Sequence, residues 1–319
     1  MDVSPLNYKL TFEPDLKKFT FAGLESISIN CKKSVNAITM NCAELKIKSC
    51  IVTSGKKIIK SYPKTNEKKE ELQIKLAEKI RGLCTIDLEF EGILNDRLLG
   101  FYRSRYEQNG KTKYLATTQF EAADARRAFP CWDEPEAKAT FEISIIADNQ
   151  FTAISNMPVK TKKKTGKTTL YNFQKTPLVS TYLIYLGVGE FEYLSGKAGK
   201  IQIRVVTTKG NTSKGKFSLE LGKKLLTSYE KYFGIKFPLP KLDLIAVPDF
   251  AAGAMENWGA ITFRETILLY DPKTSSTRTK QFIAEVISHE IAHMWFGNLV
   301  TMKWWNDLWL NESFATFMA

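Results

Sequence analysis

The chain has 319 residues, of which 44% are hydrophobic, and this size predicts about two domains with cores of their own. No run of residues approaches the roughly eighteen apolar positions of a membrane-spanning helix, and the first residues lack the basic flank and apolar stretch of a signal peptide. The net charge of +12 would suit nucleic acid or a membrane surface, but the lysines cluster in predicted turns without aromatic side chains for base stacking, so we expect neither partner and favour a solvated basic surface.

The cysteines indicate the compartment. They are Cys31, Cys42, Cys50, Cys84 and Cys131. Their number is odd and their spacing matches no paired metal site, so we interpret them as reduced thiols of a cytoplasmic protein.

Apolar and polar residues alternate through much of the N-terminal part of the chain. The apolar positions include Leu6, Tyr8, Leu10 and Phe12, then Ile27, Ile29 and Cys31, then Ile86, Leu88 and Phe90, and later Phe141, Ile143 and Ile145. A period of two, interrupted by Lys, Gly and Asn turns, predicts short strands in an antiparallel sheet with one solvated face. We expect a polar hairpin loop at residues 104–113 and the last strands of this region at 182–187 and 201–207.

The period changes after residues 209–213. Apolar residues then recur at helical spacing up to Gly234, which is placed to end the helix; they are Phe217, Leu221, Leu225, Tyr229 and Tyr232. We therefore place a domain boundary near residue 208. Buried strands are expected at 242–247 and 260–263, so the chain as a whole is predicted to be α+β.

A chemically richer stretch lies inside the β region at residues 118–135. It contains Gln119, Glu121 and the pair Arg126-Arg127. From the residues alone, a surface turn with Asp/Arg pairing is the simplest interpretation, and we expect the two arginines to brace the loop.

The loop Gly253-Ala254-Met255-Glu256-Asn257 has small residues beside an acidic one. Small side chains let an extended peptide approach the backbone, the loop amides could polarise a carbonyl, and the Glu256 carboxylate offers a partner to an α-ammonium group. For this loop taken alone, a Gly-Ala turn with a solvated Glu256 is the simpler interpretation.

The strongest chemical signal is His289-Glu290-Ile291-Ala292-His293, which contains both histidines of the chain. Residues four apart share one face of a helix, so His289 and His293 can present two imidazoles to one metal ion. Glu290 lies beside that face, where it can take a proton from a water molecule. We expect the helix to begin near Ser275–Thr277, with Phe282, Val286 and Ile287 on its apolar side.

A third ligand is predicted eighteen residues further on. Glu312 follows the helix stop Gly297-Asn298 and lies in a second apolar segment, so a helix that folds back could bring its carboxylate to the metal. Two His and one carboxylate leave a coordination position open, as in catalytic zinc sites. We interpret Trp304, Trp305 and Trp309 as core packing around these helices.

The spacing of His289, Glu290, His293 and Glu312 resembles the gluzincin signature of the M1 family of zinc aminopeptidases. Gly253–Asn257 is similar to the exopeptidase motif of that family, and residues 304–315 are similar to the soluble archaeal members called tricorn-interacting factors. The resemblance extends over essentially the whole chain. It implies a saddle-like, antiparallel N-terminal β domain at residues 1–208 and the first part of a thermolysin-like zinc peptidase domain at residues 209–319.

The resemblance also implies a reaction and a set of roles. One Zn²⁺ per chain, held by His289, His293 and Glu312, would serve hydrolysis of the first bond of peptides with a free N-terminus, with Glu290 as the general base. The carboxylates of Glu256 and Glu121 would bind the free amino terminus, and Gln119 would line the pocket for the first side chain.

Family members continue well past the position that matches Ala319. They supply a tyrosine that stabilises the tetrahedral intermediate and a helical C-terminal region that covers the cleft, and no residue here matches that tyrosine. We therefore expect an N-terminal portion of such an enzyme that can be inactive by itself. Two alternatives stay open: a metallohydrolase that opens epoxides, which turnover of aminoacyl amides would disfavour, and a noncatalytic peptide-binding or assembly module.

Overall fold

The structure is a computed structural model that describes all residues from Met1 to Ala319. Contacts divide the chain into two compact units. The first contains Met1–Arg103, Ala116–Asn149 and Val159–Ile184, and the second contains Ser104–Leu115, Gln150–Pro158 and Tyr185–Ala319. None of the helices is both long and apolar enough to cross a membrane. All five cysteines are free thiols.

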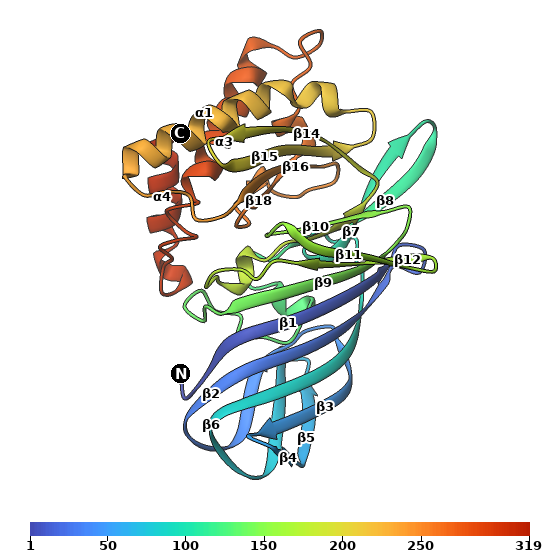
Figure 1. Ribbon diagram of the computed structural model, residues 1–319, viewed down its shortest axis with the longest axis vertical. Helices are drawn as coiled ribbons and strands as arrows, with labels where there is room; N and C mark the ends of the chain where they lie inside the picture. The colour runs from blue at the N-terminus through green and yellow to red at the C-terminus, as the bar shows by residue number, and fades with distance from the viewer. The chain divides into compact units, whose positions relative to one another are not determined.

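The first unit is built on one nine-stranded sheet with the order β11-β12-β9-β1-β2-β6-β3-β4, to which β5 is added along β6 (Figure 1). Its strands are β1 (Val3–Asp15), β2 (Thr20–Asn41), β3 (Lys46–Ser54), β4 (Lys57–Ile59), β5 (Ser61–Asn66), β6 (Glu71–Ile93), β9 (Thr140–Asp148), β11 (Val159–Thr165) and β12 (Thr168–Phe173). Two 3-10 turns, η1 (Ala125–Arg127) and η2 (Thr181–Leu183), complete it. The predicted N-terminal β domain is therefore confirmed.

The strands differ from the prediction in length and in one pairing. We expected short strands, but β2 has 22 residues and β6 has 23. Most pairs are antiparallel, whereas β1 and β9 run parallel. Such a pair joins segments that are far apart in the sequence, and the local apolar period that predicts a strand says nothing about its partner.

One face of this sheet forms an aromatic core. Tyr8 stacks on Phe141 with ring centroids 4.8 Å apart, and Phe12 lies edge-on to Phe101 at 5.9 Å. The alternating positions named above are buried except Leu6, which is 41% exposed. The register of β1 against β2 shifts between Pro5 and Asn7, and this β-bulge displaces Leu6 from the buried face.

The second unit contains two sheets. One has the order β10-β13-β8-β7, made of β10 (Thr152–Ser155), β13 (Leu186–Gly189), β8 (Lys111–Gln119) and β7 (Gly100–Gln108). Strands β7 and β8 also run into the first unit, and they form a hairpin with only Asn109-Gly110 at its tip. The predicted polar loop at 104–113 is thus mostly strand. The predicted strand at 182–187 begins at Leu186 instead, after η2.

The other sheet carries the helices. Its order is β14-β15-β16-β18-β17, made of β14 (Phe191–Ala198), β15 (Ile201–Thr208), β16 (Lys241–Val247), β18 (Ala260–Arg264) and β17 (Ala254–Met255). The remaining elements are η3 (Thr212–Gly215), α1 (Lys216–Phe233), α2 (Glu265–Leu268), α3 (Thr277–Ala292), η4 (Trp305–Asp307) and α4 (Trp309–Met318). Strands β14 and β15 precede residue 208, so the domain boundary predicted there stays a prediction.

Helix α1 covers β14 and β15 and contacts α3, and α3 contacts α4 (Figure 1). It ends before Gly234, as predicted. Its buried stripe is Leu219, Gly222, Leu226 and Tyr229, so of the five apolar positions read from the sequence only Tyr229 is fully buried. The buried stripe of a helix is about 100° wide or more. The apolar pattern alone therefore does not determine which residues near the edge of the stripe are buried.

A charged cluster lies inside this sheet. The Asp243 carboxylate accepts hydrogen bonds from Arg204 Nε and Nη2, both at 2.6 Å, and from Lys241 Nζ at 2.8 Å. Lys241 is 2% exposed and Asp243 is fully buried. Burial lowers the pKa of Lys241 to about 8. Burial acts to raise the pKa of Asp243, but the two cations outweigh it and hold that pKa below its usual value.

We predict that Asp243→Asn destabilises the protein by about 3–5 kcal/mol, because it leaves two cations without a counterion in a buried place. The free energy of unfolding from urea titration measures this loss. Glu220→Gln is the matched control: it removes a helical ion pair with Lys223 in which the Glu220 side chain is 61% exposed, and we expect a change of about 0.5 kcal/mol or less. Equal losses in the two variants would contradict the prediction.

Candidate metal centre

Helix α3 places both histidines on one face. It begins after Ser276, whose side chain accepts a hydrogen bond from Thr279 N at 3.0 Å, so the predicted helix start is confirmed. His293 follows the last helical residue in a helical conformation, and its Nε2 lies 3.0 Å from His289 Nε2. The expected apolar side was partly wrong, because Phe282 is 49% exposed and Ile283 is buried in its place.

Glu312 reaches the same point from α4. Its Oε2 lies 3.2 Å from His289 Nε2, and its Oε1 lies 3.6 Å from His293 Nε2. The second helix therefore folds back as the spacing required. Tyr229 of α1 helps to hold it, since the Tyr229 hydroxyl lies 2.8 Å from the Met318 carbonyl of α4 and 3.3 Å from the Ser288 carbonyl of α3.

These three side chains fit a zinc ion. Donor atoms about 2.0–2.1 Å from a tetrahedral Zn²⁺ lie roughly 3.3 Å from one another. The two imidazole Nε2 atoms lie 3.0 Å apart, and Glu312 approaches His289 with Oε2 at 3.2 Å and His293 with Oε1 at 3.6 Å. One ligand atom of each residue lies within 4.8 Å of the other two. Two neutral imidazoles and one carboxylate are also the donors that a catalytic zinc takes, with a further position open.

The electrostatics of the site favour a cation. Burial would lower the pKa of His293, but the carboxylates of Glu256, Glu312 and Glu290 outweigh it and raise that pKa to about 10. Burial acts to raise the pKa of Glu312, yet hydrogen bonds from His289 and His293 lower it to about 2. The side chains thus stabilise positive charge at the point where the three donors meet.

The outer nitrogens of the histidines have partners of their own. His293 Nδ1 donates to the Phe296 carbonyl at 2.9 Å, and His289 Nδ1 lies 3.4 Å from Thr316 Oγ1. A carbonyl can only accept, so the proton of neutral His293 stays on Nδ1 and its Nε2 lone pair is left for a metal.

Glu290 is a further acidic side chain next to the candidate ligands. It is buried, with 6% of its surface exposed, and its carboxylate is close enough to contribute to the raised pKa of His293. Because it follows His289 directly on α3, it cannot share the ligand face and lies beside it.

The loop Gly253–Asn257 is an edge of the helix-covered sheet. Ala254 and Met255 form β17, which pairs antiparallel with β18. Glu256 is only 3% exposed, and its Oε1 has no hydrogen-bond partner in the protein. Asn257 is fully buried and donates to Thr262 Oγ1 at 3.1 Å. The turn with a solvated Glu256 that was considered from the sequence is therefore wrong.

Gln119 is the last residue of β8, and Glu121 follows two residues later; both lie in the first unit. Gln119 is 8% exposed, and its Oε1 has no hydrogen-bond partner in the protein. The roles of Gln119 and Glu121 in substrate binding stay predictions.

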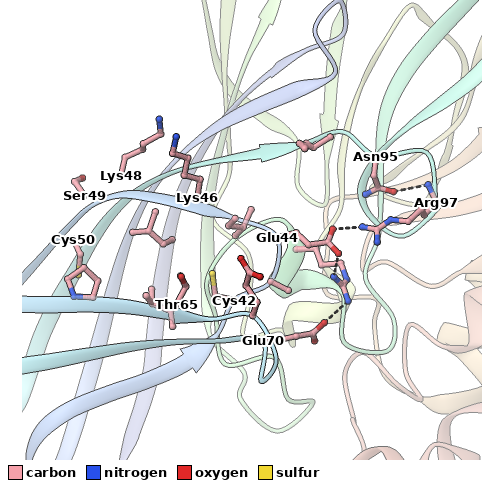
Figure 2. A pocket seen from close by; sticks show the side chains of 18 residues that line it. Cys42, Glu44, Lys46, Lys48, Ser49, Cys50, Thr65, Glu70, Asn95 and Arg97 are labelled. Carbon is pink, nitrogen blue, oxygen red and sulfur yellow. Dashed lines mark hydrogen bonds and ion pairs between the residues drawn. The ribbon is translucent and has the colours of Figure 1, made fainter.

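The two arginines brace the segment that follows, as expected. Arg126 pairs with Asp133 at 3.1 Å and with Glu70 at 3.2 Å. Arg127 pairs with Asp124 at 2.8 Å, with Glu70 at 2.7 Å and with Glu44. Figure 2 shows part of this network at one end of a cavity of about 1150 Å³, where Glu44 also pairs with Arg97. The network therefore links the segment to Glu44 and Glu70 of the first unit.

The tryptophans near α4 contradict the sequence interpretation. Trp304 is 48% exposed and Trp309 is 59% exposed, so neither is core packing, whereas Trp305 is half-buried. Asn298 has a contact at the site that its sequence position, as part of a helix stop, did not indicate. That side chain is fully buried and donates to the Glu256 carbonyl at 2.8 Å.

A His-Glu-His helix with a returning Glu, next to a sheet whose edge carries a buried carboxylate, is the arrangement of a metallopeptidase. Sequence profiles agree: the peptidase M1 N-terminal domain matches residues 4–183, and the peptidase family M1 domain matches residues 217–319. The chain belongs to peptidase family M1.

Curated relatives are named as aminopeptidases. The chain is 44% identical to aminopeptidase M1 of Arabidopsis thaliana, over 99% of this chain and 37% of that protein. It is 44% identical to mitochondrial aminopeptidase 2 of Saccharomyces cerevisiae, over 100% of this chain and 34% of the relative, and 45% identical to puromycin-sensitive aminopeptidase of Caenorhabditis elegans, over 98% and 34%. The chain thus spans about a third of the length of these relatives, and the finer likeness to archaeal members stays a prediction.

Two glycines of the site should respond differently to substitution by alanine. Gly297 has φ +122°, and a Cβ there would lie 3.3 Å from His293 Nδ1 and from Asn311 Nδ2, whereas a Cβ on Gly253 would meet nothing closer than 3.7 Å. We expect Gly297→Ala to lower the free energy of unfolding by about 1–3 kcal/mol, because a non-glycine residue is strained at that angle. Gly253→Ala should leave it within about 0.5 kcal/mol. Urea unfolding of both variants tests this, and a neutral Gly297→Ala would disprove it.

Proposed function

We propose that the chain supplies the metal centre and the amine-binding loop of a zinc aminopeptidase that hydrolyses the first bond of peptides. One observation carries the proposal. Glu256 has a buried carboxylate oxygen without a hydrogen-bond partner, and the charge of this carboxylate acts on His293 of the candidate ligand set. A metallopeptidase that must bind a free amino terminus needs such an anion beside its metal.

His289, His293 and Glu312 would hold one Zn²⁺ per chain. The ion, when bound, acts as a Lewis acid that polarises the scissile carbonyl and lowers the pKa of water. Glu290 accepts the proton of the attacking water and passes it to the leaving amine, so that the nitrogen departs as a neutral amine.

The Glu256 carboxylate would bind the protonated α-amine of the substrate. This anchors the amino terminus, so the first peptide bond is the one presented to the metal centre. Glu121 is proposed as a second anion for the amine, and Gln119 as part of the pocket for the first side chain. The free edge of β17 would pair with the peptide backbone, as exposed sheet edges do with extended peptides.

The chain spans about a third of the length of its curated relatives. We therefore propose this activity for a protein that contains these residues together with the other regions of such relatives. Its partners would be peptides with a free N-terminus and the further regions that such relatives contain. We propose a cytoplasmic location, which the five free thiols support because disulfides are rare there.

Metal content gives the first test. Elemental analysis of the purified chain should find about one zinc per molecule, and His293→Ala should lose it, because one imidazole and one carboxylate are too few donors for a tight site. Glu290→Gln is the control and should keep its zinc, since Glu290 is not a ligand. If His293→Ala retained its zinc, His293 would not be a ligand and the proposed ligand set would be wrong.

Catalysis gives the second test. In the protein that carries these residues, Glu290→Gln should lower kcat for an aminoacyl amide by about a hundredfold or more at unchanged zinc content, because the general base is lost. The unchanged protein should cleave a free peptide at least about tenfold faster than its N-acetylated twin, because acetylation removes the charge that Glu256 binds. Equal cleavage of the twins would refute the amine-binding role.

A further inference from the structure

The turn that follows α3 contacts the metal helix and the substrate loop at once. Asn298 N donates to the His293 carbonyl at 3.1 Å, and Asn298 Nδ2 donates to the Glu256 carbonyl at 2.8 Å. The Asn298 side chain is fully buried. One residue therefore joins the backbone of a candidate metal ligand to the backbone of the candidate amine-binding residue.

The turn itself is tightly bonded. The Phe296 carbonyl accepts from His293 Nδ1 at 2.9 Å, Gly297 N donates to the Val300 carbonyl at 2.7 Å, and Val300 N donates to the Trp295 carbonyl at 3.1 Å. Asn298 therefore keeps a fixed position relative to the His293 ring.

Other residues fix the rest of the loop, and none of them comes from the metal helix or its turn. Arg264 N donates to the Gly253 carbonyl at 2.9 Å, Asn156 Nδ2 to the Trp258 carbonyl at 3.0 Å, and Lys241 Nζ to the Gly259 carbonyl at 2.7 Å. These bonds hold the two ends of the loop to its own sheet and to neighbouring segments. Asn298 ties the loop to the turn after α3, and it does so at Glu256.

We propose that Asn298 is a positioning residue that sets the distance between the Glu256 carboxylate and the metal centre, and that it thereby determines the selectivity for ligands with a protonated α-amine. The inference rests on the proposed function. A misplacement of about 1 Å can cost roughly a hundredfold in a positioned reaction, so one hydrogen bond to the backbone of Glu256 is enough to control amine recognition.

A purely structural role makes a different prediction. If Asn298 only satisfied a buried carbonyl, its loss would lower stability but would leave the preference for amine-bearing ligands unchanged. The affinity difference between two ligands that differ only in the α-amine separates the two roles.

Two hydroxamates provide this measurement. Leucine hydroxamate carries both a zinc-binding group and an α-amine, and its des-amino analogue carries only the zinc-binding group. Binding of each to the zinc-loaded protein is measured by calorimetry, beside zinc content and urea unfolding. The dissociation constant of the des-amino ligand reports on the metal centre. The affinity ratio, which is the dissociation constant of the des-amino ligand divided by that of leucine hydroxamate, reports on the amine site.

The test variant is Asn298→Asp, which keeps the size of the side chain but replaces the donor with an acceptor that repels the Glu256 carbonyl. We expect the affinity ratio to fall about tenfold or more, toward the value of Glu256→Gln, while zinc content and the des-amino affinity stay within about twofold. Val300→Ala, in the same turn and with a side chain 67% exposed, should keep the full ratio. If Asn298→Asp fails to fold, Asn298→Ser gives the same measurement with a shorter donor.

The outcomes are distinct. An unchanged ratio in a folded, zinc-loaded Asn298 variant overturns the positioning role and leaves the proposed function intact. No preference for the amine in the unchanged protein overturns the proposed function together with the inference. A lower affinity ratio together with a loss of des-amino affinity by the same factor shows damage to the metal centre. This outcome also overturns the positioning role.

Discussion

The candidate metal site of the second unit is built on a concentration of negative charge around His293. Glu256, Glu290 and Glu312 come from a loop and two helices, and their carboxylates together raise the pKa of this histidine to about 10 against the effect of burial. Like charges that are gathered in a buried place are costly unless a cation shares it. A divalent ion satisfies this requirement better than one proton, and two imidazoles and a carboxylate whose ligand atoms lie within 4.8 Å of one another are donors that suit zinc.

The surrounding fold keeps these charges in place through backbone contacts. The carbonyl of Phe296 fixes the tautomer of His293, and the side chain of Asn298 reaches back to the loop of Glu256. On the far side of that loop, Lys241 bonds the carbonyl of Gly259 and shares Asp243 with Arg204. The metal helix, the loop and the sheet are therefore linked by buried polar groups, which require defined geometry where apolar packing would tolerate shifts.

The sequence allowed the chemistry to be predicted better than its surroundings. Four-residue spacing on one helix brings His289 and His293 together, and period two identifies the strands of the first unit, because both follow from local backbone geometry. Local patterns could not show the bulge at Leu6, the parallel pairing of β1 with β9, or the exposure of Trp309. Each of these depends on which distant segment lies alongside. Asn298 was missed for the same reason, since a residue that ends a helix carries no sign of the loop its side chain will meet.

Two buried carboxyl groups in this chain show why the partner matters more than the burial. Glu25 of β2 is 3% exposed and has no hydrogen-bond partner on either oxygen, and burial alone raises its pKa well above the usual value. Its surroundings therefore disfavour the ionised form of this carboxyl group. Glu256 is equally buried and also has an oxygen without a partner, but it lies close enough to His293 to stabilise positive charge there. A carboxylate held beside a cationic centre with one oxygen free is ready to accept a hydrogen bond from a second cation, and a protonated α-amine is the cation that a peptide brings.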